Sequence, residues 1–228
     1  MTEGTRPYLP LERRARAAII CFWVFIAASA LLALGLILAR SQGMNLYTED
    51  DDLEFENAAD AAAGVLVTVG GVVSVIDLLV CIIVFLMWLY RARANLPALG
   101  VSDARWSPGW AIGWWFIPIM SLFRPYQLVK EVWQASDPMT SPGWRSNAPP
   151  VFFGWWWALY LAYWTGGRFT DRYSRIAGKQ PTLDTAAWLT AVDVLALVAG
   201  AAAAWCAIRI MRDITERQRQ RHQVGAFS

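Results

Sequence analysis

The chain has 228 residues, of which 57% are hydrophobic and only 17% carry a charge, and its mean hydropathy is +0.34. A soluble domain of this length carries more charge, so the composition argues against a water-soluble protein and favours a membrane protein. The net charge of +2 is uninformative by itself, whereas the distribution of basic residues along the chain is informative.

Four apolar runs are each long enough to cross a hydrocarbon core of about 30 Å as a helix. They carry no charge except one aspartate in the second run and one in the fourth. We predict membrane spans at residues 17–38, 61–90, 149–167 and 186–208. Strands of a membrane barrel alternate apolar and polar residues, but these runs are apolar on all sides. The predicted fold is therefore an all-α integral membrane protein.

A fifth run, Gly109–Phe123, has 15 residues without a charge and reaches only about 22 Å as a helix. If it crosses, Arg and Lys number 11 inside and 9 outside; if it does not, they number 15 inside and 5 outside. Because basic residues gather on the cytoplasmic side, we predict four spans in the plasma or inner membrane with both termini cytoplasmic. Five spans remain the alternative. The acidic segment 49–60 lies outside in either arrangement.

This topology divides the chain into a basic N-tail (1–16), one transmembrane domain (17–211) and a basic C-tail (212–228). Within the domain, residues 107–136 become a re-entrant or interfacial element on the cytoplasmic side. Such irregular backbone is tolerated at membrane depth only where protein or a wet cavity covers it.

The sequence of this element predicts two helices separated by a break. Ser107 and Pro108 favour a helix start, and the helix is expected to reach about Ile117. Pro118 breaks it, and Pro125 opens a second helix. That helix is amphipathic, with Leu128, Val129, Val132 and Trp133 on one face and Gln127, Lys130, Glu131 and Gln134 on the other. It is therefore expected to lie in the membrane interface.

The same region is rich in tryptophan, including Trp110 and Trp114. One interpretation is a belt of anchors in the headgroup zone. The other is an aromatic pocket for a lipid tail, a quinone or a cationic ligand.

The run "RARANLPALG" and the later "SPGWAIGWWFIPIMSLFRPYQLVKEVWQAS" resemble a family of bacterial membrane proteins known as domain of unknown function 4328. The resemblance covers about residues 88–137 and, more loosely, the "GWWWALYLAYW" span. It implies a multi-pass bacterial membrane protein and carries over no catalytic residue. The matching positions are Arg91, Arg93, Asn95, Ser107, Pro108, Gly109, Trp110, Gly113, Trp114, Pro118, Pro125, Tyr126 and Gln127.

Asp77 and Asp193 are the strongest chemical signals, because a carboxylate inside a span costs about 2.5 to 3.5 kcal/mol on insertion scales. Each lies on a stripe of small residues that includes a hydroxyl, Ser74 or Thr190. The first interpretation is that the acids hold helices together. The second is a proton- or cation-linked site, and a remote third is an intramembrane aspartyl enzyme.

Residue types that catalysis or metal binding requires are scarce. His222 is the single histidine, the three cysteines form no CxxC pair, and no common catalytic motif is present. We therefore predict no enzyme activity, no cofactor and no metal site.

The leading functional interpretation is a binding or accessory membrane component. Its expected partners are membrane lipids, other membrane proteins or a second copy of the chain. The alternative is a small transporter or channel that uses an intramembrane aspartate. The basic tail suits anionic headgroups better than nucleic acid.

Overall fold

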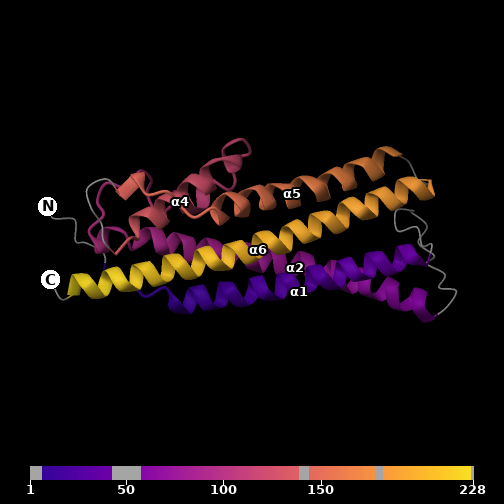
Figure 1. The fold of residues 1–228 in the computed structure, drawn as a ribbon, viewed down its shortest axis with the longest axis horizontal. Coiled ribbons are helices and arrows are strands. Elements are labelled where there is room, and N and C mark those ends of the chain that lie inside the picture. Colours follow the sequence, from indigo (N-terminus) through magenta and orange to yellow (C-terminus); the bar gives the residue numbers. More distant parts are fainter. Residues whose placement is uncertain (1–6, 43–57, 139–143, 178–181, 227–228) are drawn as a thin grey trace. The chain divides into compact units, whose positions relative to one another are not determined.

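The computed structural model describes residues 7–42, 58–138, 144–177 and 182–226, so most of the acidic segment 49–60 lies outside the described residues (Figure 1). Within these ranges every regular element is a helix, which confirms the predicted all-α class. The long helices are α1 (Glu12–Ser41), α2 (Ala58–Ala94), α5 (Phe152–Ala177) and α6 (Leu183–Ala226). The short elements are η1 (Pro97–Leu99), α3 (Trp110–Gly113), η2 (Met120–Leu122), α4 (Arg124–Ala135) and η3 (Trp144–Ser146).

Three of the long helices, α1, α2 and α6, are long and apolar enough to cross a membrane. Their outer surfaces are apolar as well: Val75, Ile76 and Leu79 of α2 are each about three-fifths exposed. A soluble protein rarely exposes so continuous an apolar surface. α5 is not among these three helices, because tryptophan, tyrosine and glycine fill its apolar half and Arg168 and Asp171 follow.

The described contacts group the chain into two compact units. Unit 1 comprises residues 1–22, 80–155 and 206–228, and unit 2 comprises residues 23–79 and 156–205. The described residues nearest both chain ends belong to unit 1, as do the described residues of the connection from α2 to α5.

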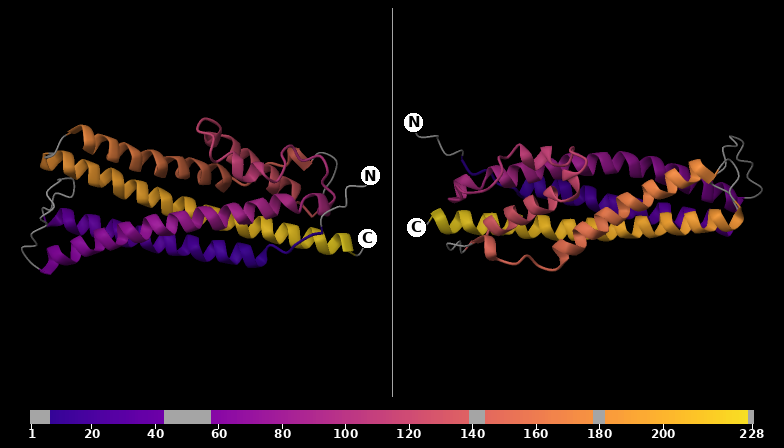
Figure 2. Two further views of the ribbon diagram at one scale, coloured as in Figure 1. Left: turned by 180° about the vertical axis from the view of Figure 1, so that it is seen from behind. Right: turned by 90° about the horizontal axis from the view of Figure 1, so that it is seen from above.

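Unit 2 is built from two antiparallel helix pairs (Figures 1 and 2). In the first pair, α1 meets α2 where Gly35 faces Leu66 and Gly70 faces Leu32. A Cβ on Gly35 would lie 2.9 Å from the Leu66 Cβ, so glycine permits this close approach. The rings of Phe25 and Tyr163 meet edge to face, with centroids 5.7 Å apart, and join this pair to α5.

Unit 1 contains the element at residues 107–136, whose first helix is shorter than predicted. Instead of running from Pro108 to about Ile117, α3 covers only Trp110–Gly113, and turns follow. Pro118 disfavours helical backbone at Ile117 and has no N–H to donate, so the turns leading into it do not extend the helix. The second predicted helix is confirmed: α4 begins at Arg124, with Pro125 in its first turn.

α4 was predicted to lie in the membrane interface with its polar face in water, but part of that polar face is buried. Glu131 and Gln134, both predicted on its polar face, are buried. Glu131 Oε1 accepts a 2.7 Å hydrogen bond from the Arg105 backbone N–H. The Gln134 amide donates to the backbone carbonyls of Arg145 and Asn147 at 2.8 and 2.6 Å. Protein therefore covers the part of the polar side that Glu131 and Gln134 form, whereas Gln127 is exposed and Lys130 is half-buried.

Candidate functional site

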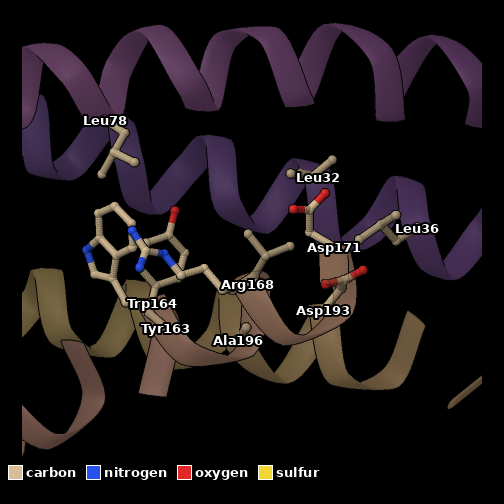
Figure 3. A pocket seen from close by; sticks show the side chains of 11 residues that line it. Leu32, Leu36, Leu78, Tyr163, Trp164, Arg168, Asp171, Asp193 and Ala196 are labelled. Atoms are coloured by element: carbon tan, nitrogen blue, oxygen red, sulfur yellow. The ribbon is translucent and has the colours of Figure 1, made fainter. Parts of the chain in front are cut away.

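A pocket lies within unit 2 and has a volume of about 430 Å³ (Figure 3). That volume falls in the usual range for small-molecule sites. It combines charged, aromatic and aliphatic groups from four helices. Its lining residues are Leu32 and Leu36 of α1, Leu78 of α2, Tyr163, Trp164, Gly167, Arg168 and Asp171 of α5, and Asp193, Ala196 and Leu197 of α6.

The residues of α5 and α6 that line the pocket lie along a close and regular seam between these two helices. Tyr163 meets Gly200, Gly166 meets Ala196, and Thr170 donates a 2.6 Å hydrogen bond to Asp193 Oδ1. Steps of three and four along α5 are matched by steps of four and three along α6, as expected of antiparallel helices. The stripe predicted around Asp193 is thus the face that α6 turns to α5.

The side chains of α5 that enter the pocket follow the same spacing. Trp164, Arg168 and Asp171 are four and three residues apart and therefore share a face. The Arg168 guanidinium carbon lies 4.7 Å from the centroid of the Trp164 ring. A long helical side chain points towards the helix N-terminus, so the charge of Arg168 lies near Trp164.

The carboxylates are at a different place from the guanidinium. Figure 3 shows Asp171 and Asp193 near Leu32 and Leu36, whereas Arg168 extends towards Trp164. The pocket therefore has a positive end and a negative end, with leucine side chains forming part of its wall.

The other predicted polar positions lie elsewhere. Asp77 is half-buried on α2 and is not among the pocket-lining residues. Ser74 is half-buried, and its Oγ has no hydrogen-bond partner among the described residues. Thr190 is buried and donates to the Ala186 carbonyl at 2.9 Å. The structure thus gathers Asp193, but not Asp77, into the pocket.

A second polar centre, in unit 1, contains the signature residue Asn95. Asn95 is fully buried and exchanges hydrogen bonds with both backbone groups of Leu9, at 3.2 and 2.9 Å. It also donates to the Gln218 side-chain oxygen at 3.2 Å. The Gln218 amide in turn donates to the Ala92 carbonyl at 2.8 Å and to Ser136 Oγ at 3.1 Å. One buried cluster thus fastens the N-terminal segment, α2, α4 and α6 to one another.

The N-terminal segment is also held by an aromatic contact. Tyr8 stacks on His222 of α6, with ring centroids 4.2 Å apart. Burial, together with the negative charge of Glu12, raises the pKa of the Tyr8 hydroxyl to about 12. Tyr8 is therefore neutral at physiological pH and acts as a packing residue.

Further signature residues lie on α2, on α4 or between α3 and α4, and they lie outside the pocket of unit 2. Arg93 is buried, interacts electrostatically with Glu131 and donates to the Ala104 carbonyl at 3.4 Å. Arg91 and Tyr126 are half-buried, Pro125 is buried and Pro118 is exposed. None of them lines the pocket in unit 2.

The tryptophans of the signature form an aromatic cluster with an arginine of the same unit. Trp110 stacks on Trp114 with centroids 4.1 Å apart. The Arg124 guanidinium carbon lies 5.8 and 5.4 Å from the ring centroids of Trp106 and Trp114, and Arg124 also donates to the Gln127 side-chain oxygen at 3.0 Å. Arg124 therefore already makes, with one face of each of these rings, the contact that an external cation would make.

Sequence reasoning missed Arg168, Asp171 and Gln218. The third span was predicted to end at residue 167, but α5 continues to Ala177 and carries Arg168 and Asp171 into the pocket. Their spacing from Trp164 was the available signal. Gln218 was assigned to a basic tail, yet it follows the buried Ile210, Met211 and Ile214 at helical spacing.

The described residues thus define an all-helical protein with three helices suited to crossing a membrane. Among them, no group of three or more His, Cys, Asp or Glu side chains is placed to hold a metal ion.

The family model described as "Domain of unknown function (DUF4328)" matches residues 49–216. The chain belongs to this family, as its signature had indicated, and the match extends well beyond residues 88–137. Neither the curated proteins nor the solved structures contain a match to the chain.

Proposed function

We propose that this protein is a bacterial multi-pass membrane protein that binds an amphiphilic ligand among its helices. The observation that carries the proposal is the pocket of unit 2, in which Arg168, Asp171 and Asp193 lie beside leucine side chains from α1 and α2. Charged groups of both signs next to an apolar wall suit a molecule with a polar head and a hydrocarbon part.

The proposed topology has four crossings, by α1, α2, α5 and α6, with both termini cytoplasmic. Its support is that the described residues nearest both chain ends and those of the connection from residue 95 to residue 151 belong to unit 1. In this arrangement residues 107–136 form a cytoplasmic-side element that does not cross. The basic residues support the same orientation, with 15 inside and 5 outside.

Reporter fusions test this topology directly. Fusions after Ser136 and after Ser228 are both expected to read cytoplasmic, and a fusion within the segment 178–181 is expected to read extracytoplasmic. An extracytoplasmic signal after Ser228 would contradict the four-span arrangement and support five spans. Activity of two reporters with opposite compartment requirements, such as a phosphatase and a fluorescent protein, provides the measurement.

Filling the pocket tests ligand binding. A Cβ added at Gly167 meets no atom within 4 Å, so Gly167→Phe is expected to fold and to fill the pocket. Wild-type protein purified in mild detergent should retain an amphiphile, and Gly167→Phe should lose most of it. Mass spectrometry of an organic extract measures the retained compound per protein.

The matched control is Gly71→Phe on α2, because a Cβ at Gly71 also meets no atom within 4 Å and Gly71 does not line the pocket. This variant should retain the compound at the wild-type level. Equal retention by both variants, or no retained amphiphile in wild-type protein, would contradict the proposed binding role.

A small transporter is the second candidate, and the observation that favours it is the Asp193 carboxylate in the pocket. Asp193 accepts a hydrogen bond from Thr170, which fixes its orientation on the α5–α6 seam. Binding is the preferred proposal because Asp77, the other acid expected to act in transport, does not line this pocket.

A further inference from the structure

We propose that the pocket of unit 2 holds the zwitterionic headgroup of an aminophospholipid, with the phosphate on Arg168 and the primary ammonium between Asp171 and Asp193. This inference rests on the proposed binding function and names the ligand class of that site. It starts from the separation of charge in the pocket, where the guanidinium lies near Trp164 and the carboxylates lie near Leu32 and Leu36 (Figure 3).

The signs of the charges select a zwitterion over a singly charged headgroup. An anionic headgroup large enough to fill the pocket would meet Arg168 at one end and two carboxylates at the other. A purely cationic ligand would meet the carboxylates and also the guanidinium. Like charges at close range repel, so each of these ligands is penalised at one end. A phosphate joined to an amine finds an opposite charge at both ends.

The direction of the charge separation matches a phospholipid in the outer leaflet. In a phospholipid the phosphate lies next to the acyl chains, and the amine lies nearer to water. On α5, the guanidinium sits at the level of Trp164, whereas Asp171 lies seven residues nearer the C-terminal end of the helix, which is about 10 Å. That end of α5 is extracytoplasmic in the proposed topology. The ammonium would therefore face water, and the phosphate would face the membrane interior.

Leu78 favours a lipid over a small soluble zwitterion. Figure 3 shows Leu78 of α2 near Trp164, at the end of the pocket where the guanidinium lies. An acyl chain that extends from a phosphate bound at Arg168 would contact the apolar side chain of Leu78 directly. A soluble phosphoethanolamine has no group that benefits from this contact.

The carboxylates favour a primary ammonium over a trimethylammonium group. A primary ammonium donates up to three hydrogen bonds to carboxylate oxygens, which Asp193 would accept in addition to the one from Thr170, whereas a trimethylammonium group donates none. An aromatic face is the usual site for trimethylammonium. In this pocket Arg168 covers one face of the Trp164 ring.

Native mass spectrometry of the full-length protein tests the inference. Protein is exchanged into micelles containing equal amounts of phosphatidylethanolamine, phosphatidylcholine and phosphatidylglycerol. We expect wild-type protein to retain phosphatidylethanolamine about tenfold or more over each of the others, since charge-assisted hydrogen bonds of this kind discriminate by at least that factor.

Substitutions at the two ends of the pocket should have different effects on lipid binding: one should reduce the amount of bound lipid, and the other should change which headgroup is preferred. Arg168→Gln should lose most bound phospholipid, and Arg168→Lys should recover part of it. The double variant Asp171→Asn and Asp193→Asn should keep a bound lipid but bring the ratio of phosphatidylethanolamine to phosphatidylcholine close to one. The control is Arg172→Gln, an exposed arginine of α5 that does not line the pocket, and it should behave as wild type. Size-exclusion chromatography verifies that each variant is folded.

The outcomes separate this inference from the proposed function. Preferred retention of phosphatidylglycerol or phosphatidylcholine, lost in Gly167→Phe, would overturn the headgroup assignment and leave the binding function intact. If wild-type protein retains no lipid, both the headgroup assignment and the proposed binding function are contradicted. Displacement of the lipid by soluble glycerophosphoethanolamine at comparable concentration would show a site for a soluble zwitterion and overturn the assignment to a lipid.

Discussion

Replacing Gln218 with Leu is expected to lower the free energy of unfolding by about 3 kcal/mol, because it leaves several buried polar groups without partners. Gln218 is fully buried and makes three hydrogen bonds, to Asn95, to the Ala92 carbonyl and to Ser136. Leucine has a similar volume, so lost hydrogen bonding rather than a cavity should dominate. Unfolding of the purified protein by increasing SDS, followed by tryptophan fluorescence, measures the change.

The loss should spread beyond the site of substitution, since the cluster joins four segments of unit 1. Asn95 also binds both backbone groups of Leu9. We therefore expect Gln218→Leu to make the N-terminal segment more accessible to proteolysis. Hydrogen exchange at the end of α2 should increase in the same variant.

Gln220→Leu is the matched control. Gln220 lies two residues further along α6, is exposed, and donates its side-chain hydrogen bond to Glu216 at 2.7 Å. Because water replaces that hydrogen bond, the control should change the stability by less than about 0.5 kcal/mol. Equal effects of the two substitutions would contradict a structural role for the buried cluster.

This cluster illustrates what the sequence could and could not predict. The importance of Asn95 followed from its place in the family signature, and the spacing of Ile210, Met211 and Ile214 is the signal that α6 continues into the segment assigned to the basic tail. The contact between Asn95 and Gln218 joins residues 123 positions apart, and no local pattern predicts such a contact. The basic residues around Gln218 indicated a solvated tail, but Arg217 and Arg221 instead contact Trp133 and the Ala135 carbonyl.

The pocket was predictable to a similar extent. The small-residue stripe around Asp193 predicted a close helix contact, and the seam with α5 is that contact. The identity of the partner helix could not be predicted, since small residues indicate proximity but not the neighbour. Arg168 and Asp171 fell outside the predicted span 149–167, because the uncharged run ends before Arg168. Helical backbone continues there because charged side chains on one face do not end a helix.

Adding a single methyl group at Gly166 should destabilise the α5–α6 seam by about 1 to 3 kcal/mol, the usual effect of overpacking a tight contact. A Cβ on Gly166 would lie 2.8 Å from the Ala196 Cβ, and neither atom is the end of a flexible side chain. The helices must therefore move apart. At the adjacent Gly167 a Cβ meets no atom within 4 Å, so Gly167→Ala should leave the stability unchanged or raise it slightly through helix propensity.

Exchanging the methyl group between the helices should restore the contact. In the double variant Gly166→Ala and Ala196→Gly, the new Cβ faces only the backbone Cα of residue 196, at the ordinary distance of 3.8 Å. We expect this variant to recover most of the stability lost by Gly166→Ala, since the cost of about 1 kcal/mol for glycine at residue 196 is offset by the gain from alanine at residue 166. The stabilities of wild type, both single variants and the double variant, measured by SDS unfolding, form a double-mutant cycle that gives the coupling energy between residues 166 and 196. Additive losses would contradict direct contact at this position, because independent sites show no coupling energy and residues in contact do.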